Sequence, residues 1–139
     1  MERGEVWWAS IGERRPVVLL SGDGEPELRA MQIVAPATAD EKRGFVVLSA
    51  EEAADPRVVH QVVSSAGAGI GGVGVEVEVG TDEGLPHNGV VRVALPRDGR
   101  VFCTWLVILT RESLVDRAGA LSRTKLDQLA NALRLARIE

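Results

Sequence analysis

The sequence has few of the residues that form disulfides or membrane-spanning segments. Only one of its 139 residues is a cysteine, so no internal disulfide can form. Cys103 lies in an apolar run, where a buried thiol behaves as a small hydrophobic side chain. No run approaches the roughly 18 apolar residues of a membrane span, and the first residues carry no apolar signal core. We therefore expect a protein of the cytoplasm that does not associate with membranes.

An excess of basic residues is also absent. The chain has 16 Lys and Arg against 20 Asp and Glu, which gives a net charge of −4 and a pI near 5.3. This balance argues against broad electrostatic coating of duplex DNA, although it leaves room for a local cationic groove. Apolar residues make up 45% of the chain, as in ordinary globular proteins. The length predicts a single domain, residues 1–139, that can bury a core without disulfides.

Short apolar segments separated by turn residues predict a mainly β fold with helices, an α+β class. Alternation of valine and glutamate in residues 73–79 should place the valines on one face and leave Glu76 and Glu78 in water. The longest apolar run, 101–109, is predicted to be a central strand. The first two segments are predicted to pair as a hairpin, residues 4–10 against 15–21. The predicted strands are residues 5–9, 15–21, 28–35, 73–79, 89–95 and 101–109.

Two helices are predicted near the C-terminus. Thr110 can cap a short helix over residues 111–117, and Ser122 can cap a longer one over 123–137. Residues 58–63 are compatible with either a strand or a short helix. The sum indicates a small, strongly bent antiparallel sheet or barrel with helices at one end.

Residues 64–74 contain five glycines, a composition found in phosphate-binding loops. Such a loop in a dinucleotide fold requires a preceding strand and a following helix. An alternating strand follows here instead, which favours a glycine-rich surface loop.

The segment most indicative of function is Glu13-Arg14-Arg15-Pro16, followed at once by an apolar run that ends at Ser21. Pro16 fixes its own φ and restricts Arg15 to an extended conformation. The apolar run should form a buried strand, so Arg15 would stand at the mouth of that strand on well-defined backbone. This is a suitable position for a cation that meets an anion in a fixed geometry. A solvated pair of surface arginines is the alternative.

Four segments carry a recognisable pattern: Arg3-Gly4-Glu5-Val6-Trp7-Trp8, Arg15-Pro16-Val17-Val18-Leu19-Leu20-Ser21, Val34-Ala35-Pro36-Ala37-Thr38 and Ala118-Gly119-Ala120-Leu121-Ser122. Together they resemble the MazF/PemK family of toxins, over roughly residues 3–38 and 84–137. The first two segments match the opening strand of the family and its Arg-Pro segment. The last two match a strand that ends in threonine and a Gly-x-Leu-Ser sequence before a terminal helix.

The resemblance implies an SH3-like β-barrel with a C-terminal helix, a homodimer, and the toxin of a type II toxin–antitoxin system. Such toxins are metal-independent endoribonucleases that need no cofactor and inhibit translation. They cut single-stranded RNA to 2′,3′-cyclic phosphate and 5′-hydroxyl ends, and a cognate antitoxin inhibits them. Arg15 stands at the family's catalytic arginine and Thr38 at its active-site threonine. Residues 39–72 are longer than the family's connection and are interpreted as an atypical loop insertion.

Metal-independent cleavage uses the 2′-hydroxyl of RNA as nucleophile and passes through a phosphorane with extra negative charge. The planar, always cationic guanidinium of Arg15 suits stabilisation of that charge. Glu13 is a candidate general base, or equally a plain ion-pair partner of Arg15. The Thr38 hydroxyl can bond a phosphate oxygen, or alternatively its own backbone in a turn.

Further candidates for contact with RNA are less specific. A tryptophan of the first strand can stack on a base if it is exposed, although a place in the core or in a dimer interface is the alternative. Histidine is the side chain whose ordinary pKa lies near neutrality, and one of the two histidines follows a proline in a loop. The candidates are Arg14, Trp7, Ser21 and His87.

A different function on the same fold is also compatible with the sequence. The related CcdB-type toxins resemble this fold and inhibit DNA gyrase through protein contacts. The alternative is therefore a non-catalytic barrel toxin or interaction module that binds a protein target. The presence of Arg15, Pro16 and Thr38 favours the ribonuclease.

Overall fold

The computed structural model describes residues 2–22, 27–66, 70–96 and 106–138, which fall into two units. The boundary between the units falls within strands β5 and β6 and helix α4. The first unit is drawn from Met1–Ala35, Glu78–Val91 and Trp105–Leu126, and the second from Pro36–Val77, Arg92–Thr104 and Asp127–Glu139. Each unit is described by itself below.

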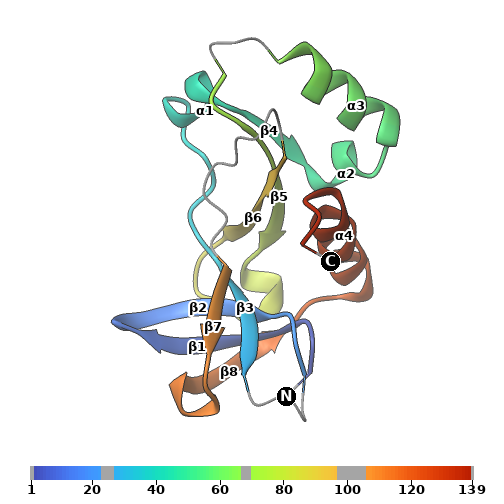
Figure 1. Ribbon diagram of the computed structural model, residues 1–139. Helices are drawn as coiled ribbons and strands as arrows, with labels where there is room; N and C mark the ends of the chain where they lie inside the picture. The colour runs from blue at the N-terminus through green and yellow to red at the C-terminus, as the bar shows by residue number, and fades with distance from the viewer. Residues whose placement is uncertain (1, 23–26, 67–69, 97–105, 139) are drawn as a thin grey trace. The chain divides into compact units, whose positions relative to one another are not determined.

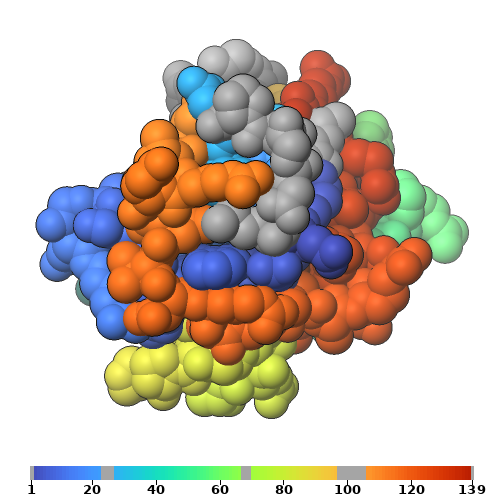
Figure 2. Space-filling view, turned by 90° about the horizontal axis from the view of Figure 1, so that it is seen from below, coloured from blue at the N-terminus to red at the C-terminus, as the bar shows by residue number. Residues whose placement is uncertain are grey.

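A five-stranded antiparallel sheet forms the first unit, in the order β7-β3-β2-β1-β8 (Figure 1). The predicted N-terminal hairpin is confirmed, with Val6 opposite Val18 and Ala9 opposite Arg15. Figure 2 shows β8, in orange, lying along the blue β1. The strands are β1 (Glu5–Ile11), β2 (Glu13–Leu19), β3 (Leu28–Gln32), β7 (Leu106–Leu109) and β8 (Leu114–Ala120).

The two-residue period of the strands separates the side chains of this sheet into two faces. On one face, fully buried side chains from β1, β2 and β3 form a hydrophobic cluster with Leu109 of β7. Trp7, Ile11, Val107 and Leu114 are partly buried and pack against it. The buried members are Ala9, Val17, Leu19, Leu28, Ala30 and Leu109.

The end of the β1–β2 hairpin extends beyond the neighbouring strands (Figure 1). Among the described residues, β3 pairs with β2 only over Val17–Leu19, and β8 pairs with β1 only over Glu5–Ala9. Within residues 10–15, called the hairpin end below, Ser10 pairs with Arg14 and Ile11 with Glu13, while Arg15 pairs with Ala9. Glu13, Arg14 and Arg15 are exposed, whereas Ile11 packs against the hydrophobic cluster.

The predicted helix over residues 111–117 is wrong. A single 3₁₀ turn, η2 (Arg111–Ser113), leads directly into β8, which adds to the edge of β1 with two register shifts. The pairing is between segments more than 100 residues apart, and such tertiary pairing overrides the weak local preference for helix.

The predicted central strand over 101–109 is also wrong in its described part. β7 lies at the edge of the sheet and pairs, among the described residues, with β3 alone. Ile108 is 63% exposed as a result. Residues 101–105 of that prediction lie outside the described residues.

The second unit contains a parallel strand pair and several short helices. β4 (Val46–Ser49) pairs in parallel with β5 (Val73–Val79), and β6 (Gly89–Leu95) lies on the other side of β5. The stretch 39–72, interpreted above as an atypical loop insertion, holds β4 and the helices α1 (Glu41–Gly44), α2 (Ala50–Ala53) and α3 (Pro56–Ser65). Whether residues 1–139 form one domain stays a prediction.

Local capping explains why the helices of this stretch form. Ser49 and Glu52 form a reciprocal capping box at α2. Asp55 accepts a hydrogen bond from the Arg57 amide, and Pro56 occupies the first position of α3. Of the two alternatives for residues 58–63, the helix is therefore correct. Residues 67–69 of the glycine-rich segment lie outside the described residues.

The C-terminal helix α4 (Arg123–Leu135) confirms the prediction for this segment. Its Lys125 amide donates to Ser122 Oγ at 3.2 Å, the expected cap. Leu129, Ala132 and Leu133 are fully buried. Among the residues that the structure describes, no helix is both long and apolar enough to cross a membrane.

Candidate functional site

Arg15 lies on β2 at the hairpin end, opposite Ala9 of β1. Its Nη2 donates to Glu13 Oε1 at 2.6 Å. The side chains are 46% and 71% exposed, respectively. An exposed ion pair of this kind contributes little to stability because water screens it. The guanidinium can therefore exchange Glu13 for another anion at small cost.

The opposite face of the hairpin carries a second arginine. The Arg14 guanidinium lies over the Trp8 ring, 4.9 Å from its centroid, and Nη2 is 3.0 Å from Asp116 Oδ2. Trp8 pairs directly with Asp116 across β1 and β8, so three neighbouring strands contribute to this arrangement. It brings an indole, a guanidinium and a carboxylate together on this face of the hairpin.

Trp7, a predicted RNA contact, points to the other face because successive side chains alternate along a strand. It packs against the hydrophobic cluster, and its Nε1 donates to Glu5 Oε1 at 2.9 Å. Trp8 is consequently the tryptophan whose ring lies beside Arg14. The sequence alone could not decide between the two because either face of β1 could have been the core face.

Glu5 is held in its ionised form at the base of β1. Burial raises the pKa of its carboxyl, but hydrogen bonds from Trp7 and from the Glu2 amide and the nearby Arg117 guanidinium outweigh burial. The net result is a pKa below the ordinary value of a glutamate. The site therefore keeps one fixed negative charge under the Trp7 indole.

The two other predicted RNA contacts of the first unit are placed differently. Ser21 is only 6% exposed, and its Oγ accepts a hydrogen bond from the Arg29 amide at 2.8 Å. It thus closes the connection between β2 and β3. His87 is exposed in the loop between the 3₁₀ turn η1 (Thr81–Glu83) and β6.

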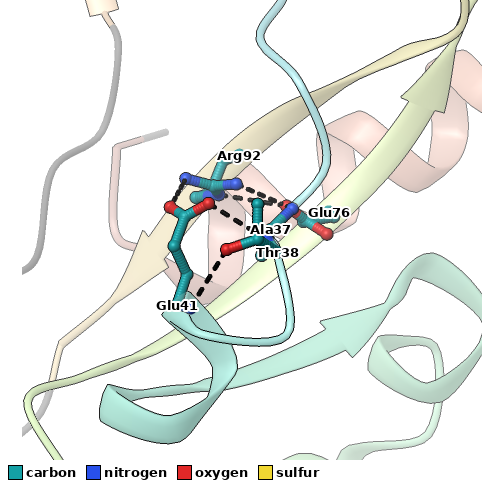
Figure 3. A network of polar contacts seen from close by, with 5 residues as sticks. All are labelled: Ala37, Thr38, Glu41, Glu76 and Arg92. Carbon is teal, nitrogen blue, oxygen red and sulfur yellow. Dashed lines mark hydrogen bonds and ion pairs between the residues drawn. The ribbon is translucent and has the colours of Figure 1, made fainter.

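Thr38 lies in the second unit, in the turn before α1 (Figure 3). Its Oγ1 accepts from the Glu41 amide at 3.1 Å, and its own amide donates to Glu41 Oε1 at 3.0 Å. This reciprocal arrangement is a capping box, so the predicted turn alternative is realised. The pKa of the Glu41 carboxyl is lowered, chiefly by the hydrogen bond from the Thr38 amide. Desolvation raises this pKa, but the Thr38 hydroxyl and the charge of Arg92 lower it further.

A buried ion pair behind Thr38 was not predicted. Arg92 Nε and Nη2 both donate to Glu76 Oε2, at 3.0 and 2.9 Å, and the same oxygen accepts from the Ala37 amide at 3.1 Å. The side chains of Arg92 and Glu76 are 9% and 11% exposed. The prediction that Glu76 faces water is wrong, since Arg92 of the neighbouring strand covers it. An arginine within the otherwise apolar run of β6 was the available signal, because buried charges require partners.

The sequence-predicted catalytic residues thus fall into two groups. Arg15 and Glu13 lie side by side at the hairpin end in the first unit, and Thr38 lies in the second unit with Glu41, Glu76 and Arg92. The first group offers an exposed cation with a carboxylate beside it. The second offers a hydroxyl on backbone that several hydrogen bonds hold in place.

Comparison with solved structures identifies proteins of the same fold. The chain is similar to "Mycobacterium tuberculosis toxin MazF-mt6", with a TM-score of 0.56, 16% identity and 96% of each chain covered. It is also similar to an "Endoribonuclease in complex with its cognate antitoxin from Mycobacterial species", with a TM-score of 0.54, 13% identity, and 99% of this chain and 92% of that chain covered. No family model matches the sequence, and no curated protein matches it. The predicted fold class, an SH3-like α+β fold of the MazF type with a C-terminal helix, is confirmed.

Proposed function

We propose that this protein is a toxin of the MazF/PemK family and acts as a metal-independent endoribonuclease on single-stranded RNA. It acts as a homodimer, leaves 2′,3′-cyclic phosphate and 5′-hydroxyl ends, and thereby inhibits translation. A cognate antitoxin binds and inhibits it. The proposal joins the MazF-type fold with the family motifs of the sequence, Arg15-Pro16 and Thr38 among them.

The observation that carries the proposal is the exposed guanidinium of Arg15 at the hairpin end. The Arg15 side chain is 46% exposed on its face of the hairpin, so an extended RNA strand can reach the guanidinium. The guanidinium presents a planar fork of donors that matches two phosphate oxygens. Its partner Glu13 is itself exposed, so a phosphate can replace it.

Arg15 stabilises the charge that develops on the phosphorane when the 2′-oxygen attacks the phosphorus. Glu13, whose Oε1 lies 2.6 Å from that guanidinium, accepts the 2′-hydroxyl proton as general base. The bond from phosphorus to the 5′-oxygen then breaks, and the departing 5′-oxygen takes a proton from water. The Thr38 hydroxyl donates a hydrogen bond to a phosphate oxygen. The oxygen of that hydroxyl accepts from the Glu41 amide, and its proton, which faces the Glu41 carboxylate, turns to the phosphate oxygen when RNA binds.

The face of the hairpin that carries Arg14 and Trp8 supplies binding rather than chemistry. An indole and a guanidinium in contact offer stacking area and positive charge, the two components of sequence-tolerant binding to single strands. His87 remains a candidate for an additional contact because its side chain is exposed.

The test is cleavage of an unstructured RNA by the purified protein in EDTA, followed by analysis of both new ends. We expect a cyclic phosphate upstream of each cut and a free hydroxyl downstream. A 2′-deoxy substitution at the mapped cut should abolish cleavage there because it removes the nucleophile. Intact RNA after long incubation with folded protein would refute the proposal, and binding to a gyrase subunit under the same conditions would favour the non-catalytic alternative.

A further inference from the structure

The turn that carries Thr38 is fixed by contacts on both sides of that residue (Figure 3). The amide of Ala37 donates to Glu76 Oε2, and the amide of Thr38 donates to Glu41 Oε1. Both carboxylates face the same guanidinium, since Arg92 lies 2.9 Å from Glu76 and 3.8 Å from Glu41. Arg92 therefore links the acceptors of two consecutive amides.

We propose that Glu76 and Arg92 are positioning residues that hold the Thr38 hydroxyl in the orientation needed to donate to a phosphate oxygen. The inference rests on the proposed function, in which Thr38 touches the scissile phosphodiester. Neither Glu76 nor Arg92 contacts RNA in this scheme. They act through the backbone of residues 37 and 38 and through Glu41.

The geometry of Glu76 sets it apart from an ordinary buried ion pair. A single oxygen, Oε2, accepts from two guanidinium nitrogens and from the Ala37 amide. Hydrogen bonds to an ionised group are shorter and stronger than neutral ones, so loss of the charge weakens all three contacts together. The Ala37 amide is then held less firmly, and Thr38, the next residue, moves with it.

Misplacement of a reacting group by about 1 Å lowers rates by about 100-fold without abolishing substrate binding. A positioning role for Glu76 therefore predicts a loss in kcat with little change in KM. A purely structural role predicts a loss of folded protein, which lowers the active concentration and leaves the kcat of the remaining folded molecules unchanged.

The kinetic experiment is a double-mutant cycle between Glu76→Gln and Thr38→Ala, measured on the RNA at 20 °C after active protein has been quantified. We expect Glu76→Gln to lower kcat about 10- to 100-fold in the wild-type background and less than about twofold in the Thr38→Ala background. Glu78→Gln, the same substitution at an exposed position of the same strand, is the matched control and should leave kcat unchanged. Independent, multiplicative losses would overturn the proposal.

A second variant covers the case in which Glu76→Gln does not fold. Glu41 lies at the exposed end of the network. Glu41→Gln removes the negative charge of the carboxylate that accepts the hydrogen bond from the Thr38 amide. It should lower kcat at least about threefold, again only when Thr38 is present. An unchanged kcat in this variant would count against the proposal.

Amide hydrogen exchange tests the positioning without any RNA. The Ala37 amide should exchange at least about tenfold faster in Glu76→Gln than in the wild type, while the amide of Val75 in β5 keeps its rate. Unaltered exchange at Ala37 would refute the positioning role even if the RNA is cut. Conversely, faster exchange in a protein that cuts no RNA would refute the proposed function and leave the control of the turn by Glu76 standing.

Discussion

The guanidinium of Arg14 lies over the ring of Trp8, 4.9 Å from its centroid, and is held there by Asp116 on the adjacent strand. A ring that is covered by a planar cation keeps a fixed orientation at the side of the hairpin. The same arrangement joins β1, β2 and β8, although Arg14 and Asp116 are more than half exposed. The contact therefore defines a binding surface more than it stabilises the fold.

The first prediction concerns this surface. Trp8→Ala should weaken the binding of a labelled single-stranded 2′-O-methyl RNA about tenfold, because one stacking contact is worth about 1–3 kcal/mol. Fluorescence anisotropy measures the affinity, and the modified RNA cannot be cut because its 2′-oxygen is blocked. Trp7→Phe, on the opposite face of the same strand, is the control and should leave the affinity unchanged. Equal losses in both variants would contradict the assignment.

The second prediction concerns the proposed catalytic cation. Arg15→Ala should lower the rate of RNA cleavage about 10²- to 10³-fold, the usual effect of removing one preorganised charge donor. The free energy of unfolding should change by less than about 0.5 kcal/mol, since its ion pair with Glu13 is exposed. Arg15→Lys should recover only part of the rate, because lysine keeps the positive charge but lacks the planar pair of N–H donors of the guanidinium. Arg57→Ala on α3 is a control, and a cleavage rate in Arg15→Ala equal to that of the wild type would exclude Arg15 from catalysis.

The third prediction follows from the lowered pKa of Glu5. A carboxyl whose pKa is lower in the folded than in the unfolded protein stabilises the fold above the unfolded pKa, near 4.5, and loses this contribution as the pH falls through the folded pKa. Glu5→Gln should therefore reduce the free energy of unfolding by about 1.5–3 kcal/mol at pH 7, the scale of hydrogen bonds to a charged group. Urea unfolding at pH 7 and pH 3 measures the difference between the two proteins. A difference that is as large at pH 3 as at pH 7 would argue against a role for the charge.

The fourth prediction concerns two glycines where backbones approach closely. A Cβ on Gly84, which has φ +89°, would collide with the carbonyl oxygen of Ala118, and one on Gly119 would collide with that of Glu83. Gly84→Ala should cost about 2–4 kcal/mol of stability, measured by urea unfolding. Gly12→Ala, at φ +73° with no atom near its Cβ, bears the conformational cost alone, about 1–2 kcal/mol. Equal costs at Gly84 and Gly12 would show that the contact with Ala118 relaxes freely.

The features that the sequence predicted well depend on neighbouring residues. The β1–β2 hairpin follows from alternation and from Pro16, and the start of α4 follows from its cap, Ser122. Each signal lies within a few residues of the structure that it specifies. Such local signals were enough to place Arg15 on extended backbone beside a buried strand.

The features that sequence reasoning missed depend on partners far away along the chain. β8 forms a strand because it pairs with β1. Arg117 of β8 donates a hydrogen bond to Glu5, which lies 112 residues earlier in the sequence. Glu76 is covered because Arg92 lies on the neighbouring strand. A period of two predicts which face a side chain takes but does not reveal what covers that face.

The pairing of β1 with β8 has a consequence for how the molecule is made. β1 is synthesised more than 100 residues before β8, its partner in the sheet. At about 5–20 residues per second, this delay lasts roughly 6–20 s. During that interval the edge of β1 that later pairs with β8 is unpaired. A chain whose synthesis stops before β8 cannot complete the sheet. Completion of the sheet thus waits for the synthesis of β8, and its non-local pairing makes it one of the slower steps of folding.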